Sequence, residues 1–226
     1  MLVTIHQPDF APWVGFFQRW NLADVYIVLD DVQFLRRGWH HRDKIKTKQG
    51  AKWLTLPTCK SGKRHQLINE VVLDGTDNWR RSLPETIRHA YHKSPFFDEH
   101  FDALKSLFLQ APESLFEFNM SLLNLGAEYL GVSSEVVCSS SLRVDSKSSQ
   151  RLVELVHHVG GTRYLVGSGS RAYLDVALFE KAGIEVVWYE PVVKAYEQLH
   201  GQFIPGLSMI DFMLMGVGRE EVLGNC

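Results

Sequence analysis

Residues 2–31 read LVTIHQPDFAPWVGFFQRWNLADVYIVLDD, and this stretch predicts the fold. Residues 2–5 and 25–29 are apolar, as buried strands are, and a short amphipathic segment at 12–22 connects them. A strand, a helix and a second strand in this order are typical of a parallel α/β sheet. In open α/β sheets, ligands bind beyond the carboxyl ends of the strands. We therefore expect a binding site among the residues that follow these two strands.

The whole chain has the composition of an ordinary soluble globular protein. Its 226 residues are 45% hydrophobic and 22% charged, with a net charge of −2, so nucleic-acid binding is not expected. No apolar stretch approaches the roughly 20 residues that cross a bilayer. The N-terminus lacks a signal-peptide pattern, so we expect a cytoplasmic protein. The three widely spaced cysteines fit neither a disulfide framework nor a zinc site.

The remaining segments alternate as βα units do, apart from one block. Strands are predicted at 53–57, 68–73, 135–138, 163–166 and 184–188, and helices at 146–159, 173–182 and beyond 207. Residues 76–130 instead contain three predicted helices in succession. We therefore predict one α/β domain over residues 1–226. It is built on a Rossmann-like, parallel-rich sheet, with residues 76–130 as a helical insertion.

His6 and Gln7 follow the first strand directly, so they should project at the carboxyl edge of the sheet. The pKa of an ordinary histidine lies near 6.5, so His6 could act as an acid or a base, or donate to a phosphate. The alternative is a histidine that only bonds the backbone of its loop. We favour His6 and Gln7 as catalytic residues, because polar groups at a strand end are costly unless they are used.

Asp30 and Asp31 follow the second strand and offer two carboxylates. They could bind magnesium together with a nucleotide phosphate, or order the segment around Arg42 through salt bridges. Neighbouring residues of an extended chain point to opposite sides, so only one of the two should face a given site. Asp30 is a candidate catalytic residue, and Asp31 is a candidate substrate ligand.

Two basic segments could bind an anionic ligand. Arg42, Lys44 and Lys46 alternate, which places them on one face of an extended segment. An arginine there offers a two-pronged contact to phosphate or carboxylate. The alternative is a solvated edge strand that charge protects from pairing. Residues 60–64, KSGKR, form a second basic segment, which is more simply an exposed hairpin.

Residues 167–171, GSGSR, lie between a predicted strand and a predicted helix. Small residues at such a position let backbone N–H groups approach an anion. Gly167, Gly169, Ser170 and Arg171 are therefore candidate ligands of a phosphate or carboxylate. The segment lacks the spacing of a dinucleotide fingerprint and the lysine of a P-loop. An ordinary strand-to-helix turn is the alternative.

Taken together, these motifs resemble the WbqC-like family of bacterial proteins over nearly the whole chain. The resemblance is carried by HQPDF at 6–10, PWVGFF at 12–17, ADV at 23–25, LDDVQF at 29–34, HRDKIK at 41–46, WLTLP at 53–57, YLVGSG at 164–169, YLD at 173–175, and the series Tyr196, Gln198, Phe203, Pro205, Ser208 and Asp211. The chain departs from the family pattern at Phe10-Ala11, where the family usually has an aromatic residue followed by leucine. It also has His41 and Asp43 where the family usually has asparagine.

This resemblance implies a function. Family members occur in gene clusters for O-antigen and related polysaccharides, where acyl or aminoacyl transfer to an activated amino sugar has been suggested. It also implies Tyr173, Tyr196 and Gln198 as substrate ligands and Asp211 as a catalytic residue. A weaker similarity, at residues 169–174, is to nucleotidyl-transferring enzymes of the HIGH superfamily. That similarity suggests ATP and magnesium as cofactors, although the His-x-Gly-His core of those enzymes is absent.

Three functions follow from these patterns. The preferred one is a transferase that binds a phosphorylated or nucleotide-linked small molecule, with Arg42, Lys46 and Arg171 neutralising negative charge. The second is a non-catalytic module of the same pathway that binds a nucleotide sugar or docks onto a partner. Its expected docking surface is an exposed aromatic patch, formed by Trp13, Phe16, Phe17 and Trp20. A glycosyltransferase ranks last, because the chain is short for one.

Overall fold

The computed structural model describes residues 1–59, 65–76 and 78–224, so the basic segment at 60–64 lies outside it. Within the described residues, the main sheet has five strands, all parallel, in the order β5-β2-β1-β6-β7. Their bounds are β1 Leu2–His6, β2 Val25–Val28, β5 Glu135–Cys138, β6 Arg163–Gly167 and β7 Glu185–Tyr189. The predicted Rossmann-like, parallel-rich sheet is confirmed.

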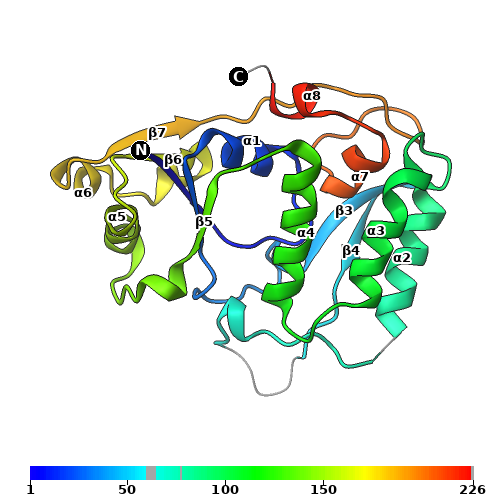
Figure 1. The fold of residues 1–226 in the computed structure, drawn as a ribbon, viewed down its shortest axis with the longest axis horizontal. Helices are drawn as coiled ribbons and strands as arrows, with labels where there is room; N and C mark the ends of the chain where they lie inside the picture. The colour runs from blue at the N-terminus through cyan, green and yellow to red at the C-terminus, as the bar shows by residue number, and fades with distance from the viewer. Residues whose placement is uncertain (60–64, 77, 225–226) are drawn as a thin grey trace.

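Alternation along the central strands assigns the two faces of the sheet. Val3 and Ile5 of β1 pack into a core that includes residues of α5 (Ser148–His158) and α6 (Val176–Lys181). Tyr26 and Val28 of β2 lie in the larger core on the opposite face, with α1 (Val14–Leu22) and α4 (Leu115–Leu130). Because helices cover both faces (Figure 1), β2 is buried along its whole length.

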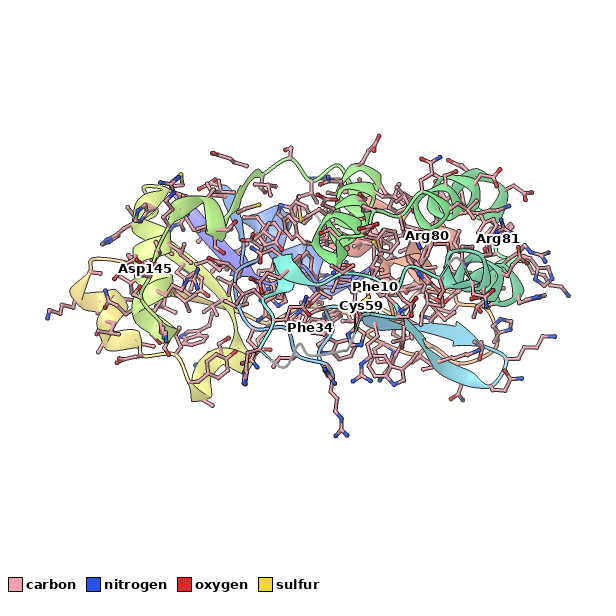
Figure 2. All side chains as sticks on the ribbon, turned by 90° about the horizontal axis from the view of Figure 1, so that it is seen from below. Phe10, Phe34, Cys59, Arg80, Arg81 and Asp145 are labelled. Carbon is pink, nitrogen blue, oxygen red and sulfur yellow. The ribbon has the colours of Figure 1, made fainter. Side chains whose placement is uncertain are left out.

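The other half of the molecule contains a hairpin and most of the helices. Its elements are the antiparallel pair β3 (Arg42–Thr47) and β4 (Gly50–Thr55), with α2 (Asn78–Tyr91), α3 (Phe97–Leu109), α4, α7 (Met209–Leu214) and α8 (Arg219–Leu223). Figure 1 shows α2, α3 and the hairpin at the end opposite to α5 and α6. In Figure 2, Arg80 and Arg81 of α2 mark this end and Asp145, just before α5, marks the other. No helix in the described part of the chain is long and apolar enough to span a membrane.

Local chemistry explains where the elements begin and end. Helix α4 starts after Ser114, whose hydroxyl accepts a hydrogen bond from the Glu117 N–H at 3.3 Å, and it stops at Gly131 with a φ of +63°. The predicted strand at 68–73 is wrong. Residues Ile68–Glu70 form a short 3-10 helix instead, because Ile68 and Val71 are buried three residues apart, a helical and not an extended spacing. The helix predicted from Tyr173 begins only at Val176.

The strand order reverses between β1 and β6. The chain builds the sheet outward from β1 through β2 to β5, then returns to the other side of β1 for β6 and β7. At such a point, the segments that follow the two neighbouring strands leave in opposite directions, and a crevice opens beyond their carboxyl ends. The ends of β1 and β6 therefore mark the place where this sheet can hold a ligand.

Candidate functional site

A cleft of about 550 Å³ opens at the reversal point of the sheet. Its walls come from the end of β1, from α1 and the segment before it, from β3 and the segment before it, from the ends of β6 and β7 with the segments that follow them, and from Gly206. The titratable side chains among the lining residues are those of His6, Asp9, Arg19, Asp43, Tyr189 and Glu190. The volume suits a small molecule, and the mixture of charges suits one with a polar or anionic group.

His6 ends β1 and lines this cleft, as its position after the strand predicted. Its Nδ1 lies 2.9 Å from the Gln7 carbonyl oxygen, and a carbonyl only accepts, so Nδ1 carries the proton and Nε2 keeps its lone pair. Burial and the nearby Arg19 lower the pKa of His6 to about 4. The imidazole is therefore neutral at physiological pH and can accept a proton at Nε2. The backbone bond that we considered as an alternative exists, and it fixes the tautomer that a base requires.

Arg19, on α1, brings a guanidinium into the same cleft. Among the described residues, no hydrogen bond or ion pair engages this guanidinium, although it lies close enough to Asp9 for the two charges to interact. A Cβ atom on Gly167 would lie 3.2 Å from Arg19 Nη1, so a small residue at the end of β6 gives the guanidinium its space. An arginine remains charged at neutral pH. Arg19 is thus placed to bind an anion.

Asp9 lies between two histidines. Its Oδ2 is 3.6 Å from His6 Nδ1, and its Oδ1 is 3.4 Å from His40 Nδ1. The His40 side chain is almost fully buried, so the Asp9 carboxylate links the cleft to the interior. The two loops that carry these groups are joined by Asn119 of α4, whose amide donates to the Pro8 and His40 carbonyl oxygens at 2.8 and 2.7 Å.

Asp43 is the second carboxyl group of the cleft, and only 2% of it is exposed. Burial raises its pKa to about 8; the Lys44 N–H, which donates to Oδ1 at 2.6 Å, opposes this rise, and the neighbouring Asp9 charge adds to it. Asp43 therefore holds its proton at neutral pH and can donate a hydrogen bond. Asp9, Arg19 and Asp43 were missed in the sequence analysis, although Asp9 and Asp43 lie inside motifs quoted there and Arg19 lies in the amphipathic segment at 12–22.

The GSGSR segment is divided between the cleft and the surface. Gly167, Ser168 and Gly169 line the same cleft as His6. Residues Ser168–Ala172 form a short 3-10 helix, in which the Ser170 hydroxyl meets the Tyr173 hydroxyl at 2.9 Å. The Arg171 guanidinium stacks 4.5 Å above the ring of Trp188 and lies outside the cleft, and Tyr173 is 73% exposed. The structure brings the glycines together with His6 but leaves Arg171 outside.

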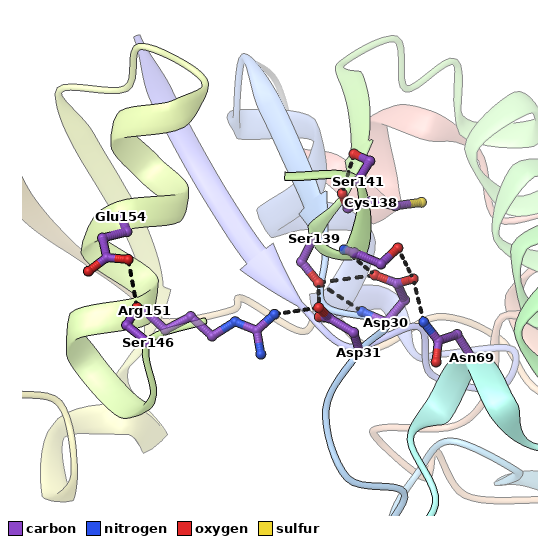
Figure 3. A network of polar contacts seen from close by, with 10 residues as sticks. Asp30, Asp31, Asn69, Cys138, Ser139, Ser141, Ser146, Arg151 and Glu154 are labelled. Atoms are coloured by element: carbon purple, nitrogen blue, oxygen red, sulfur yellow. Dashed lines mark hydrogen bonds and ion pairs between the residues drawn. The ribbon is translucent and has the colours of Figure 1, made fainter. Parts of the chain in front are cut away.

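Asp30 and Asp31 form a structural junction between strand ends and α5 (Figure 3). The Asp30 carboxylate accepts hydrogen bonds from the Ser140 N–H at 3.0 Å and hydroxyl at 2.6 Å, and from the Asn69 amide at 3.1 Å. Asp31 pairs with Arg151 at 2.5 Å. The alternative of salt bridges to the Arg42 segment is wrong, because Asp31 pairs with Arg151 and Arg42 donates to the Arg37 carbonyl oxygen.

Both carboxylates lie within hydrogen-bond distance of one hydroxyl, that of Ser139. The expectation that they face opposite sides is therefore wrong, because the chain bends at Asp31 and is not extended there. With the oxygens of Asp30 bound to protein donors, the pair does not fit a magnesium ion. Over the described ranges, no cluster of three or more histidine, cysteine or acidic side chains could hold a metal.

The predicted basic row on β3 is also divided. Arg42 and Lys44 lie together over the ring of Trp53, at 4.4 and 5.0 Å from its centroid. Lys46 is buried, and its ammonium donates to the carbonyl oxygens of Gly201 and Gln202 at 3.0 and 2.6 Å. Neither Arg42, Lys44 nor Lys46 is among the residues that line the cleft.

Asp211, Tyr196 and Gln198 form a second buried cluster, away from the cleft lining. The Asp211 carboxylate is inaccessible to solvent and accepts from Tyr91 Oη at 2.8 Å, Tyr196 Oη at 2.6 Å and Gln198 Nε2 at 2.8 Å. Tyr91 Oη in turn accepts from the Lys46 N–H at 2.8 Å. This cluster joins the hairpin, α2 and α7, which is a structural role.

The expected aromatic patch on α1 is not exposed. Phe16, Phe17 and Trp20 are at most 5% exposed and belong to the large core. Helix α1 lies between the sheet and the helical half of the molecule. The rings of Trp20 and Tyr26 have their centroids 4.8 Å apart, and those of Phe17 and Phe212 have theirs 6.0 Å apart. This part of the docking hypothesis is therefore wrong.

A parallel sheet with a ligand-sized cleft at its reversal point defines an α/β protein of the Rossmann-like type. Residues 7–223 match the WbqC-like protein family, and the chain belongs to this family. It is 34% identical over 220 residues to the uncharacterized protein Rv1507c of Mycobacterium tuberculosis, a match that covers 96% of this chain and 94% of that protein. No solved structure matches the chain.

Proposed function

We propose that this protein is a transferase that moves an acyl or aminoacyl group from a phosphate-activated carboxyl to the amine of an activated amino sugar. The observation that carries the proposal is one cleft with a neutral imidazole, an uncommitted guanidinium and a protonated carboxyl, those of His6, Arg19 and Asp43. Environments that push the pKa values of two groups apart assign base and acid roles. The resemblance to proteins of polysaccharide gene clusters supports the choice of an amino sugar as acceptor.

The chemistry of amide formation matches these three groups. The amine attacks the carbonyl carbon, so that a C–N bond forms while the C–O bond to the phosphate breaks. The proton that leaves the nitrogen passes to Nε2 of His6. Arg19 binds the departing phosphate, and the Asp43 hydroxyl donates to the carbonyl oxygen as negative charge develops on it. An acyl phosphate and an acyl adenylate both require a base, a site for the departing phosphate and a donor to the carbonyl oxygen. These groups therefore do not distinguish the two donors, and the test below includes ATP.

The binding test compares two arginines. Thermal shifts are measured with pyrophosphate, with ATP and magnesium, and with a uridine-diphosphate amino sugar. Arg19→Met should abolish the stabilisation, whereas Arg171→Met should retain it, because Arg171 lies over Trp188 outside the cleft. Stabilisation by ATP and magnesium supports carboxylate activation within this protein, and stabilisation by the sugar nucleotide supports its role as acceptor. If no probe stabilises the wild-type protein, or if both variants behave alike, the proposal is wrong.

The catalytic test separates an enzyme from a binding module. The wild-type protein is incubated with the amino-sugar nucleotide, ATP, magnesium and a mixture of amino acids and short carboxylic acids, and products are detected by mass spectrometry. His6→Ala should lower product formation by about 10²–10⁴-fold, the usual loss of a general base, while it keeps the thermal shift. A wild-type protein that binds the sugar nucleotide but leaves it unchanged would instead be a non-catalytic binding module.

A further inference from the structure

We propose that the mouth of the cleft is a ring-binding subsite built on the indole of Trp39. The ligand would then carry a sugar or base ring next to the anionic group that Arg19 binds. This inference rests on the proposed function for the anion, but not for the ring. It assigns a role to a pair of exposed tryptophans that the acid–base chemistry of the cleft does not use.

Trp39 is both a lining residue of the cleft and an exposed one. Nearly half of it, 47%, is open to solvent. Its backbone is fixed, because its carbonyl oxygen accepts from the Phe10 N–H at 3.0 Å and the next residue, His40, is buried. Large indoles are costly to leave in water, and an exposed apolar group at the rim of a cleft marks a binding surface. Trp39 is therefore held in place with its ring available to a ligand.

A second tryptophan supports the first. The ring of Trp53, on β4, lies 5.2 Å from that of Trp39, at an angle of 44°, and is itself 40% exposed. Arg42 and Lys44 hold the Trp53 ring by cation–π contacts. Arg42 is anchored further by its bond to the Arg37 carbonyl oxygen at 2.6 Å. Trp39 thus contacts a second indole, and that indole carries two positive charges against its ring.

These charges restrict the kind of ring. Two cations against the Trp53 ring favour an anionic ligand over a neutral apolar molecule. An indole face stacks equally on a planar base and on the C–H face of a pyranose, so the shared chemistry is a ring joined to a phosphate. The phosphate reaches Arg19 within the cleft while the ring rests on Trp39 at the mouth.

The test compares three monophosphates by isothermal titration calorimetry: inorganic phosphate, glucose 1-phosphate and uridine monophosphate. In the wild-type protein, at least one ring-bearing probe should bind about tenfold more tightly than inorganic phosphate, the usual gain from one aromatic stack. Trp39→Ala should remove this gain and leave the affinity for inorganic phosphate unchanged. Trp39→Phe should keep most of it. Leu35→Ala is the matched control, because Leu35 is 52% exposed on the same segment and does not line the cleft.

Each outcome decides the inference. A gain for glucose 1-phosphate alone identifies a sugar as the ring, and a gain for uridine monophosphate alone identifies a base. If the wild-type protein shows no gain from a ring, or if Trp39→Ala weakens all three probes equally, the subsite does not exist.

Arg19→Met separates this result from the proposed function. Loss of inorganic phosphate binding in that variant, without any ring gain in the wild type, overturns the subsite alone. A ring gain that depends on Trp39, with phosphate binding indifferent to Arg19, overturns the proposed anion site alone.

Discussion

Replacing Asp43 by asparagine should stabilise this protein at neutral pH and leave its stability unchanged in acid. Asp43 is 2% exposed, and burial raises its pKa from an ordinary 3.8 to about 8. The native protein therefore holds a proton that the unfolded chain releases. A raised pKa in the folded state contributes stability that is complete below the unfolded pKa and is lost as pH rises toward the folded one. The free energy of unfolding of the wild type should fall between about pH 4 and pH 8 on account of Asp43.

The magnitude follows from the same pKa values. One pKa unit corresponds to about 1.36 kcal/mol. Between the ordinary pKa of 3.8 and pH 7, the free energy of unfolding of the wild type therefore falls by about 4 kcal/mol. Asparagine has the same shape and ionises in neither state. Its Oδ1 can accept from the Lys44 N–H, which in the wild type lies 2.6 Å from Asp43 Oδ1. Asp43→Asn should therefore exceed the wild type in stability by up to about 4 kcal/mol at pH 7, and match it near pH 4.

The assay is urea unfolding followed by tryptophan fluorescence at several pH values from 4 to 8. His6 also affects the acid side: its lowered pKa means that stability is lost as pH falls from 6.5 toward about 4. Both proteins carry His6, so the difference between them isolates Asp43. Asp145→Asn is the control, because Asp145 is exposed, lies at one end of the molecule (Figure 2) and does not line the cleft. Parallel pH curves for Asp43→Asn and the wild type would refute a protonated Asp43.

Three further substitutions test other parts of the structure. Asp211→Asn should cost about 2–3 kcal/mol in urea unfolding, because an amide cannot accept all three hydrogen bonds of the buried carboxylate; ligand affinity in the cleft should change little. Ser139→Ala should lower stability by about 1–3 kcal/mol, since it unlinks both carboxylates of the strand junction, and an unchanged melting temperature would contradict that role. Gly15→Ala should weaken ligand binding in calorimetry and cost about 1–3 kcal/mol, because its Cβ would lie 2.5 Å from the Trp13 ring and 2.8 Å from Pro191.

The tertiary structure decided which polar residues face the ligand. Asp30 and Asp31 had the right position after a strand, but a bend in the chain and donors from Ser139, Ser140 and Arg151 made them a junction. Arg19 lies in the predicted amphipathic segment at 12–22 and was not among the predicted site residues, yet α1 places its guanidinium in the cleft. Such outcomes depend on partners more than 100 residues away in the chain, which no local pattern contains.

The apolar pattern of the sequence was enough to predict the parallel sheet and the edge at which the cleft lies. The apolar runs at 2–5 and 25–29 and the helix between them predict a parallel unit, because both faces of such strands must be buried. They also place His6 at the carboxyl end, where the structure puts it in the cleft beside Gly167 and Gly169. Only the tertiary structure placed Asp43 in the same cleft, because the other walls come from segments near residues 167, 190 and 206, and its burial there raises its pKa. The periodicity of a sequence predicts which face of a strand or helix a side chain occupies. A site also depends on which other segments pack against that face, and only the tertiary structure sets those segments.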